Sequence, residues 1–282
     1  MNRPSFPAKM PAATQVTNYV VNKSATHNVG TAQTSGIGLE SRAVRQRMVD
    51  KLAAQGITDA AVLHAMGTVE RHRFVDTALV GQAYEDTSLP IGLGQTISKP
   101  NVVARMLELL RQGAALSARQ GAALSARQGA AMSLGQGAAM SVGQGRPKAG
   151  RVLEIGTGCG YQAALLAQLC GDVYSIERLR GLHDKARDNL RPLRVANLHL
   201  IFGDGMPGYP KGAPYAAIIA AAGGDALPPA WLDQLAVGGR LVAPVQSANG
   251  SQALVVVDKT AQGVTHTVLE AVHFVPLKSG TN

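Results

Sequence analysis

A glycine-rich turn is the part of the sequence whose spacing most clearly points to chemistry. The apolar run Val152–Ile155 leads into Gly156, Gly158 and Gly160, and a helix-forming stretch begins directly afterwards. Between a strand and a helix, such glycines let the backbone come close to a ligand at the carboxyl end of a parallel sheet. The turn, including Thr157 between its first two glycines, therefore predicts a binding site for a nucleotide-like cofactor.

Three acidic residues near the ends of successive predicted strands narrow the choice of cofactor. Glu154 stands two residues before the first glycine, where a carboxylate suits the cationic methionine end of S-adenosyl-L-methionine better than a pyrophosphate. Glu177 ends the next strand and can accept both ribose hydroxyls, and Asp204, followed by Gly205, ends the third and can bind the adenine amino group. We therefore expect S-adenosyl-L-methionine as the cofactor and no metal ion. The alternative for Glu154 is a strand-end residue that faces solvent.

Two hydroxyl residues precede a predicted helix in residues 94–98, which read Gly-Gln-Thr-Ile-Ser. Thr96 and Ser98 alternate along an extended segment, so both side chains can face one ligand. Ser98 also comes shortly before Pro100, a residue favoured in the first turn of a helix, so its hydroxyl can instead cap that helix. The two roles are compatible, because a helix N-terminus attracts carboxylates.

The elements that position these residues alternate along the second half of the chain. Strand-like and helix-like stretches follow one another, which predicts βαβ units and a mostly parallel sheet. The last two strands follow each other without a helix, which indicates an antiparallel edge pair. Upstream helices are expected over 41–55, 58–66 and 100–110, with Thr58 or Asp59 as the cap of the second. The expected strands are 152–155, 173–176, 198–202, 216–220, 240–244, 253–257 and 265–274, and the expected helices between them are 161–169, 179–190 and 229–235.

The net charge of +9 is concentrated in two stretches outside the regular pattern. Residues 1–40 carry a net charge of +2 and residues 111–150 one of +5. A nucleic-acid surface normally places its Lys and Arg on a folded face, so we expect no nucleic-acid partner. We expect residues 1–40 to be a disordered tail. Residues 111–145 repeat an octad such as Arg-Gln-Gly-Ala-Ala-Leu-Ser-Ala and are expected to be a low-complexity insertion in a single domain over 41–282.

The cysteine content and the hydropathy of the sequence indicate the cellular compartment. Cys159 and Cys170 have no metal-ligand spacing and make no disulfide framework. No apolar run reaches the roughly 18 residues of a membrane span, and the first residues lack the apolar stretch of a signal peptide. We therefore expect a cytoplasmic protein without a membrane partner.

Several longer motifs occur together in this chain. Residues 83–98 read Ala-Tyr-Glu-Asp-Thr-Ser-Leu-Pro-Ile-Gly-Leu-Gly-Gln-Thr-Ile-Ser, and the final five residues are the most specific. They are accompanied by Glu-Ile-Gly-Thr-Gly-Cys-Gly at 154–160, Val-Tyr-Ser-Ile-Glu at 173–177, Gly-Gly-Arg-Leu-Val-Ala-Pro at 238–244 and Val-His-Phe-Val-Pro-Leu at 272–277. Over residues 41–110 and 146–277 the chain resembles the protein-L-isoaspartate (D-aspartate) O-methyltransferases.

The resemblance implies an α/β, Rossmann-like class I methyltransferase fold: a mostly parallel seven-stranded sheet with helices on both faces and an antiparallel edge. It implies methylation, by S-adenosyl-L-methionine, of the free carboxyl of L-isoaspartyl and D-aspartyl residues in damaged proteins and peptides, which initiates their repair. Such a carboxylate is ionised at neutral pH, so the enzyme aligns two bound partners and needs no general base. It assigns Ser98 and Thr96 to catalysis, Gln95 and Gly205 to cofactor binding, and Ile97, Ser98 and Val275 to substrate binding. We expect a monomer.

Two alternatives stay open. The chain could be a methyltransferase for another substrate, against which residues 94–98 argue. It could also be a catalytically decayed protein that still binds S-adenosyl-L-methionine. The second alternative is motivated by two departures from the family pattern: the octad insertion, and Ala216 where the family usually has Asp.

Overall fold

The computed structural model describes residues 42–113, 150–247 and 250–282 of the chain. All three ranges belong to one compact unit, Gly36–Asn282. The expected tail and residues 114–145 of the expected insertion lie outside the described residues. None of the helices in the three ranges combines the length and the apolar character that crossing a membrane requires.

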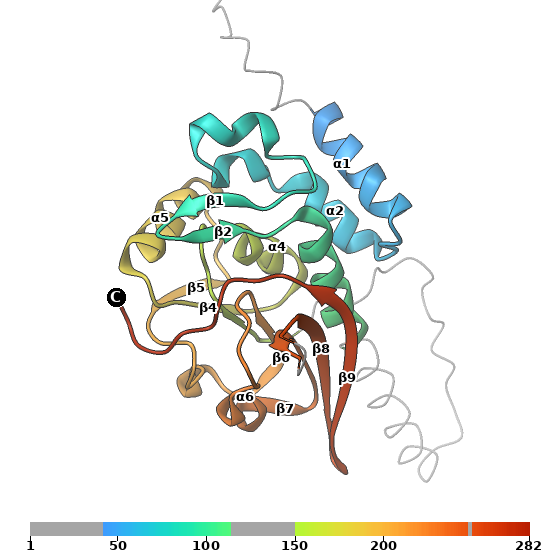
Figure 1. Cartoon of the computed structure of the whole chain (residues 1–282), viewed down its shortest axis with the longest axis vertical. Coiled ribbons are helices and arrows are strands. Elements are labelled where there is room, and N and C mark those ends of the chain that lie inside the picture. Colours follow the sequence, from blue (N-terminus) through green and yellow to red (C-terminus); the bar gives the residue numbers. More distant parts are fainter. Residues whose placement is uncertain (1–41, 114–149, 248–249) are drawn as a thin grey trace, which may run out of the picture. The chain divides into compact units, whose positions relative to one another are not determined.

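Seven strands form one sheet at the centre of the fold: β3 (Val152–Ile155), β4 (Val173–Glu177), β5 (Leu198–Phe202), β6 (Tyr215–Ala220), β7 (Leu235–Gln246), β8 (Gln252–Thr260) and β9 (Gly263–Val272). Their order is β5-β4-β3-β6-β7-β8-β9 (Figure 1). The strands from β5 to β7 are parallel, whereas β8 and β9 are antiparallel to their neighbours. The predicted α/β fold with an antiparallel edge is therefore confirmed.

Alternate residues of the central strands point to opposite faces of the sheet and build two cores. Val152 belongs to the larger core and its neighbour Leu153 to the smaller one. Every residue of β3 is buried, because both faces of the sheet are covered. Helices α4 (Tyr161–Leu169) and α5 (Arg180–Leu190) contribute to the larger core, and α6 (Pro229–Gln234) buries its tryptophan in the smaller core on the opposite face (Figure 1).

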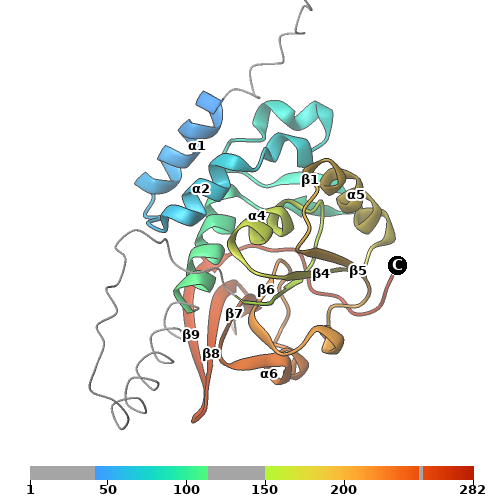
Figure 2. The ribbon, with the colours of Figure 1, turned by 180° about the vertical axis from the view of Figure 1, so that it is seen from behind.

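The segment before the sheet is helical. Helices α1 (Arg42–Ala54) and α2 (Ala60–Thr68) pack side by side (Figures 1 and 2), and residues 100–113 form a further helix. Asp59 caps α2, since its Oδ1 accepts the backbone N–H groups two and three residues later at 2.9 and 3.3 Å. The predicted cap is therefore Asp59, while the backbone N–H of Thr58 donates to a glutamate of the third helix at 2.7 Å.

The helix of residues 100–113 is longer than predicted and includes the first three residues of the octad repeat. Arg111 explains the extension, because its Nε donates to Asp59 Oδ2 at 3.0 Å. Both side chains are almost fully buried, with 4% and 5% exposed. A buried ion pair holds this last turn, which the repetitive composition did not reveal.

A separate two-stranded hairpin, β1 (Leu89–Gly92) and β2 (Gln95–Ile97), precedes that helix. The sequence predicted an extended segment here but not its antiparallel partner. At the tip, Gly92, Leu93 and Gly94 all have positive φ, of 97°, 51° and 69°. Two glycines around one residue allow this reversal, because glycine adopts the left-handed region without penalty.

Several strand ends differ from the prediction, and two of these differences have a clear cause. β7 begins at Leu235 rather than at residue 240, because Leu235 pairs with Tyr215 before a bulge, and the regular register then continues from Arg240. β9 ends at Val272 rather than at residue 274, because the backbone N–H of Phe274 donates to a side chain, Oε1 of the β8 residue Gln252, at 2.6 Å.

Candidate active site

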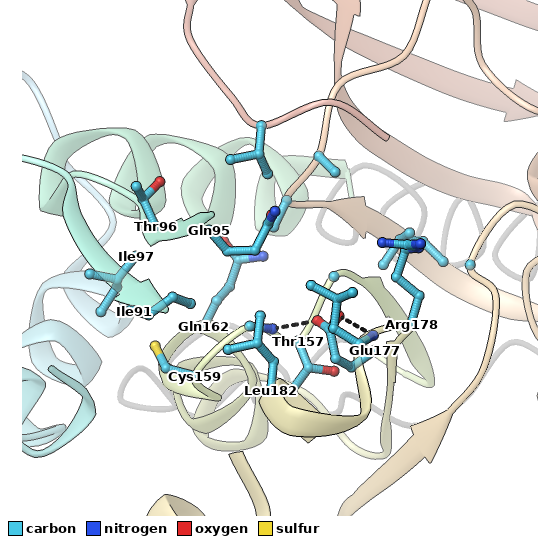
Figure 3. Close-up of a pocket in the computed structure, with 18 of the residues that line it drawn as sticks. Ile91, Gln95, Thr96, Ile97, Thr157, Cys159, Gln162, Glu177, Arg178 and Leu182 are labelled. Atoms are coloured by element: carbon cyan, nitrogen blue, oxygen red, sulfur yellow. Dashed lines mark hydrogen bonds between the residues drawn. The ribbon is translucent and has the colours of Figure 1, made fainter. Parts of the chain in front are cut away.

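A pocket of about 310 Å³ opens at the carboxyl ends of β3, β4 and β6. Its walls come from hairpin β1–β2, the glycine turn with the start of α4, the β4–α5 connection, and residues of the C-terminal segment 275–282. Figure 3 shows Gln95, Thr96 and Ile97 of the hairpin on one side, and Glu177 and Arg178 on the other. This is the edge of an open α/β sheet at which ligands bind.

The glycine turn connects β3 to α4. Gly156, Gly158 and Gly160 have φ of 90°, 57° and 90°, a region that side-chain-bearing residues rarely adopt. A Cβ on Gly160 would lie 2.8 Å from Cδ1 of Leu190, so this glycine also permits close packing. Gly156, Thr157 and Gly158 line the pocket, whereas Gly160 is the N-cap of α4 and does not.

Glu177, the last residue of β4, ties the turn to the next strand. Its Oε2 accepts the backbone N–H of Gly158 at 2.9 Å, and its Oε1 accepts that of Leu179 at 2.9 Å (Figure 3). The side chain lines the pocket although it is only 5% exposed. Because a carboxylate has about four acceptor positions, Glu177 can bind ribose hydroxyls as predicted while it holds the turn.

Glu154 is fully buried within β3 and does not line the pocket. The alternative of a residue that faces solvent is therefore wrong. Ser175 Oγ donates to Glu154 Oε2 at 2.5 Å and lies 2.6 Å from Oγ1 of Thr157, which does line the pocket. Burial raises the pKa of Glu154 to about 8, although the Ser175 hydrogen bond opposes the rise. The predicted contact with the methionine end remains a prediction, with Thr157 and Ser175 as its connection to the ligand.

Asp204 follows β5 and does not itself line the pocket, whereas the adjacent Gly205 does. Oδ1 of Asp204 accepts the backbone N–H of Met206 at 2.8 Å, and Oδ2 accepts that of Gly280 at 2.6 Å. The C-terminal segment is thus bound to the residue predicted to contact adenine. The same segment pairs with the β4–α5 connection, where Asn282 exchanges backbone hydrogen bonds with residues 178 and 180 at 2.9 and 2.8 Å.

The predicted substrate residues meet in this pocket. Gln95, Thr96, Ile97 and Ser98 all line it, as does Val275 from the C-terminal segment. Ile97 is 4% exposed, as expected for an apolar wall. The structure therefore brings together all residues that the sequence assigned to catalysis and substrate binding.

The hydroxyl of Ser98 is not used to cap the following helix. Oδ1 of Asp86 accepts the backbone N–H of Asn101 at 2.9 Å and so takes the capping position. Within the described ranges, the Ser98 hydroxyl has no hydrogen-bond partner, while its backbone carbonyl accepts from Nη2 of Arg71 at 2.7 Å. Ser98 lines the pocket, and its hydroxyl is free of protein partners in the described ranges.

Several residues of the pocket wall were not predicted from the sequence. Tyr161 and Gln162 come from the first turn of α4, Leu182 comes from α5, and residues 276–278 come from the C-terminal segment. The first turn after a glycine loop points toward the ligand, so Tyr161 and Gln162 could have been found. Residues 276–278 carry no local signal, because tertiary contacts alone bring them here.

Ala216, which departs from the family pattern, lies away from the pocket. It is the second residue of β6, and its backbone N–H donates to the carbonyl of Arg151 at 2.8 Å. The pocket is built at the opposite, carboxyl end of β6. The missing aspartate therefore removes no group from the candidate site.

A family profile and the related sequences that match this chain point to one family. The profile of the protein-L-isoaspartate (D-aspartate) O-methyltransferase family matches residues 43–129 and 146–282. A protein-L-isoaspartate O-methyltransferase of Methylibium petroleiphilum is 54% identical over 250 residues, covering 88% of this chain and 82% of the relative. One of Leptothrix cholodnii is 56% identical over 254 residues, covering 88% and 78%.

Solved structures agree on the fold. A protein-L-isoaspartate O-methyltransferase superposes with a TM-score of 0.66 at 24% identity, covering 83% of this chain and 66% of the other. A chain from Plasmodium falciparum assigned to the same enzyme class, in complex with S-adenosyl-L-homocysteine, gives 0.64 at 22%, covering 83% and 98%. On the sequence matches, this chain belongs to the protein-L-isoaspartate (D-aspartate) O-methyltransferase family.

Proposed function

We infer that this protein transfers the methyl group of S-adenosyl-L-methionine to the free carboxyl of L-isoaspartyl and D-aspartyl residues in damaged proteins and peptides. Family membership supports the reaction, since relatives covering most of the chain at more than 50% identity carry this enzyme name. The observation that carries the substrate assignment is that Ser98 lines the pocket together with the cofactor turn, while its hydroxyl is not used as a helix cap.

The residues present suit the cofactor. Two left-handed glycines, Gly156 and Gly158, line the pocket at the end of β3, and Glu177 offers acceptors for a ribose. When bound, S-adenosyl-L-methionine would supply an electrophilic methyl group: a carboxylate oxygen forms the new C–O bond of a methyl ester while the sulfur–methyl bond breaks and leaves S-adenosyl-L-homocysteine. We assign the cofactor end of the pocket to Gly156, Thr157, Gly158 and Glu177, with Gly160, Glu154, Asp204, Gly205 and Gln95 in support.

At the substrate end of the pocket, the residues have to align the substrate carboxylate with the methyl group, and they do not have to transfer a proton. A peptide carboxylate is ionised at neutral pH, so no general base is needed. Ser98 donates a hydrogen bond that orients the carboxylate, and Thr96 lies two residues earlier in the same extended segment. Ile97 and Val275 form apolar walls for the peptide. Holding two reactants in a productive geometry is worth several kcal/mol or more, which is the contribution these residues make.

The test is methyl transfer from labelled S-adenosyl-L-methionine to an L-isoaspartyl peptide and to its normal L-aspartyl twin. We expect label in the isoaspartyl peptide alone. Equal labelling of both peptides would support a methyltransferase with another substrate. Binding of S-adenosyl-L-homocysteine with no labelling of either would support a catalytically decayed protein.

The role of Ser98 is tested by Ser98→Ala. Loss of a hydrogen bond to a charged group removes about 1.5–3 kcal/mol, so we expect kcat/KM to fall by roughly tenfold to a hundredfold. Affinity for S-adenosyl-L-homocysteine should not change. Ser88→Ala is the matched control, because Ser88 is exposed, precedes the same hairpin and does not line the pocket. An unchanged kcat/KM in Ser98→Ala would contradict the assignment.

We further propose that the protein acts as a cytoplasmic monomer, in one methyltransferase domain over 41–282, without nucleic acid. The location of the excess charge supports the last point, because most of it falls in residues 1–40 and 111–150. Light scattering after size-exclusion chromatography tests the monomer. Binding to double-stranded DNA and single-stranded RNA at physiological salt tests the absence of a nucleic-acid partner.

A further inference from the structure

Arg71 is a fully buried arginine that the proposed reaction has not yet used. It begins the short helix η1 (Arg71–Phe74) and is 0% exposed. Its Nε donates to the carbonyl of Ala83 at 2.8 Å, and its Nη2 donates to those of Ser98 at 2.7 Å and Thr87 at 3.4 Å. One guanidinium thus joins η1 to both ends of the hairpin segment that carries the substrate residues.

One carboxylate in the described part of the chain acts on the charge of Arg71: Asp86, which opposes the lowering of the pKa of Arg71 by burial. No carboxylate there forms a salt bridge with it, and its buried Nη1 has no hydrogen-bond partner. Burial lowers the pKa of Arg71, but a guanidinium begins so far above neutral pH that it stays protonated. Buried charges are normally paired, because leaving one unpaired is costly. A ligand that brings a further negative charge close to the Arg71 guanidinium would therefore be stabilised.

The guanidinium lies directly behind the pocket wall. Its Cζ is 4.9 Å from the ring centroid of Tyr161, and Tyr161, Cys159 and Ser98 all line the pocket. Burial raises the pKa of the Tyr161 phenol to about 12 and that of the Cys159 thiol to about 11, and the Arg71 charge opposes both rises. The charge therefore acts on groups that face the ligand.

We propose that Arg71 is a positioning residue that adapts this pocket to an anionic substrate. It fixes the backbone of Ser98 and places a buried positive charge, without a salt-bridge partner in the described part of the chain, behind the substrate end. The proposal rests on the proposed function, because the anion in question is the substrate carboxylate. The sequence assigned no role to Arg71, whose three acceptors lie 12, 16 and 27 residues away.

The kinetic consequence differs from that of a catalytic group. The carboxylate loses its negative charge as it accepts the methyl group, so a nearby positive charge stabilises bound substrate more than the transition state. Removing the charge should therefore raise KM and leave kcat nearly unchanged or slightly higher. A residue that only supports the fold would instead lower the active fraction, and with it kcat.

The direct test compares two competing peptides on the protein saturated with S-adenosyl-L-homocysteine. One peptide carries an L-isoaspartyl residue and the other its α-carboxamide, which has nearly the same shape but no charge. We expect the wild type to bind the carboxylate at least about tenfold more tightly. In Arg71→Met that preference should shrink to about twofold or less, while Arg71→Lys, which keeps a charge, should retain most of it.

Arg73→Met is the matched control, because Arg73 is a cation on the same short helix with about half of its side chain exposed. It should keep the wild-type preference. Equal weakening of both peptides in Arg71→Met would overturn the proposal and leave a structural role. If Arg71→Met does not fold, Arg71→Lys decides: a retained carboxylate preference supports the proposal, and a lost preference overturns it. Failure of the wild type to methylate any isoaspartyl peptide would refute the proposed function instead.

Discussion

Replacing Glu154 by Gln tests the electrostatics beneath the glycine turn. Glu154 is 0% exposed, and one of its oxygens accepts the Ser175 hydroxyl, while Oε1 has no partner among the described residues. Glutamine has almost the same shape and can still accept from Ser175 through its carbonyl oxygen. The substitution therefore removes the titratable proton with little change in packing.

The expected magnitude follows from the pKa of Glu154, which burial raises from the ordinary 4.5 to about 8. Between these values the folded protein holds a proton that the unfolded chain has released, so rising pH favours unfolding. The stabilisation is complete below pH 4.5 and is lost by about pH 8. At 1.36 kcal/mol per pKa unit, the wild type loses about 5 kcal/mol across this window relative to Glu154→Gln.

The assay is urea unfolding of both proteins, without cofactor, at several pH values from about 5 to about 8.5. The free energy of unfolding of the wild type should fall with pH relative to that of the variant. Glu85→Gln, at an exposed position, is the control and should follow the wild type. Parallel curves for wild type and Glu154→Gln would show that Glu154 is already ionised at neutral pH and would refute the reasoning.

Three further substitutions test the glycine turn, the Glu177 carboxylate that holds it, and the ion pair between Arg111 and Asp59. Gly160→Ala should cost about 2 kcal/mol, from positive φ and from contact with Leu190; an unchanged melting temperature would contradict this. Glu177→Gln weakens two hydrogen bonds and should raise the dissociation constant of S-adenosyl-L-homocysteine roughly tenfold or more by calorimetry; wild-type affinity would argue against ribose binding. Arg111→Met leaves Asp59 buried without its ion-pair partner and should cost about 3 kcal/mol. Adding Asp59→Asn should restore part of that loss, and strict additivity in chemical denaturation would exclude the coupling.

Much of the sheet could be predicted, because its signals are local. An apolar run followed by spaced glycines identified β3 and the turn, and the acid at the end of β4 is the residue that holds the turn. The hairpin at residues 89–97 was missed although Gly92 and Gly94 signal a reversal, because the segment was interpreted only through its hydroxyls. Local patterns do identify turns, provided that both flanking runs are considered.

Other features depend on contacts between distant residues. Whether Glu154 faces solvent or the core is decided by how both sheet faces are covered, and the sequence left that choice open. The bond between Gly280 and Asp204 joins residues 76 positions apart. Arg71 likewise depends on three carbonyls whose approach only the folded hairpin creates. These contacts arise from tertiary packing, so the periodicity of the sequence does not predict them.

The hydrogen bond between Asp204 and Gly280 ties the C-terminal segment to the residue that is predicted to bind adenine. Asp204 already accepts two backbone N–H groups, so an incoming adenine shares an acceptor that is held in place rather than one that is free to rotate. By linkage, whatever strengthens the hold of residues 275–282 on this edge strengthens cofactor binding, and bound cofactor protects the segment in return. If Asp204 binds adenine as predicted, a change that loosens residues 275–282 therefore weakens cofactor binding, and cofactor affinity is best measured with this segment unaltered.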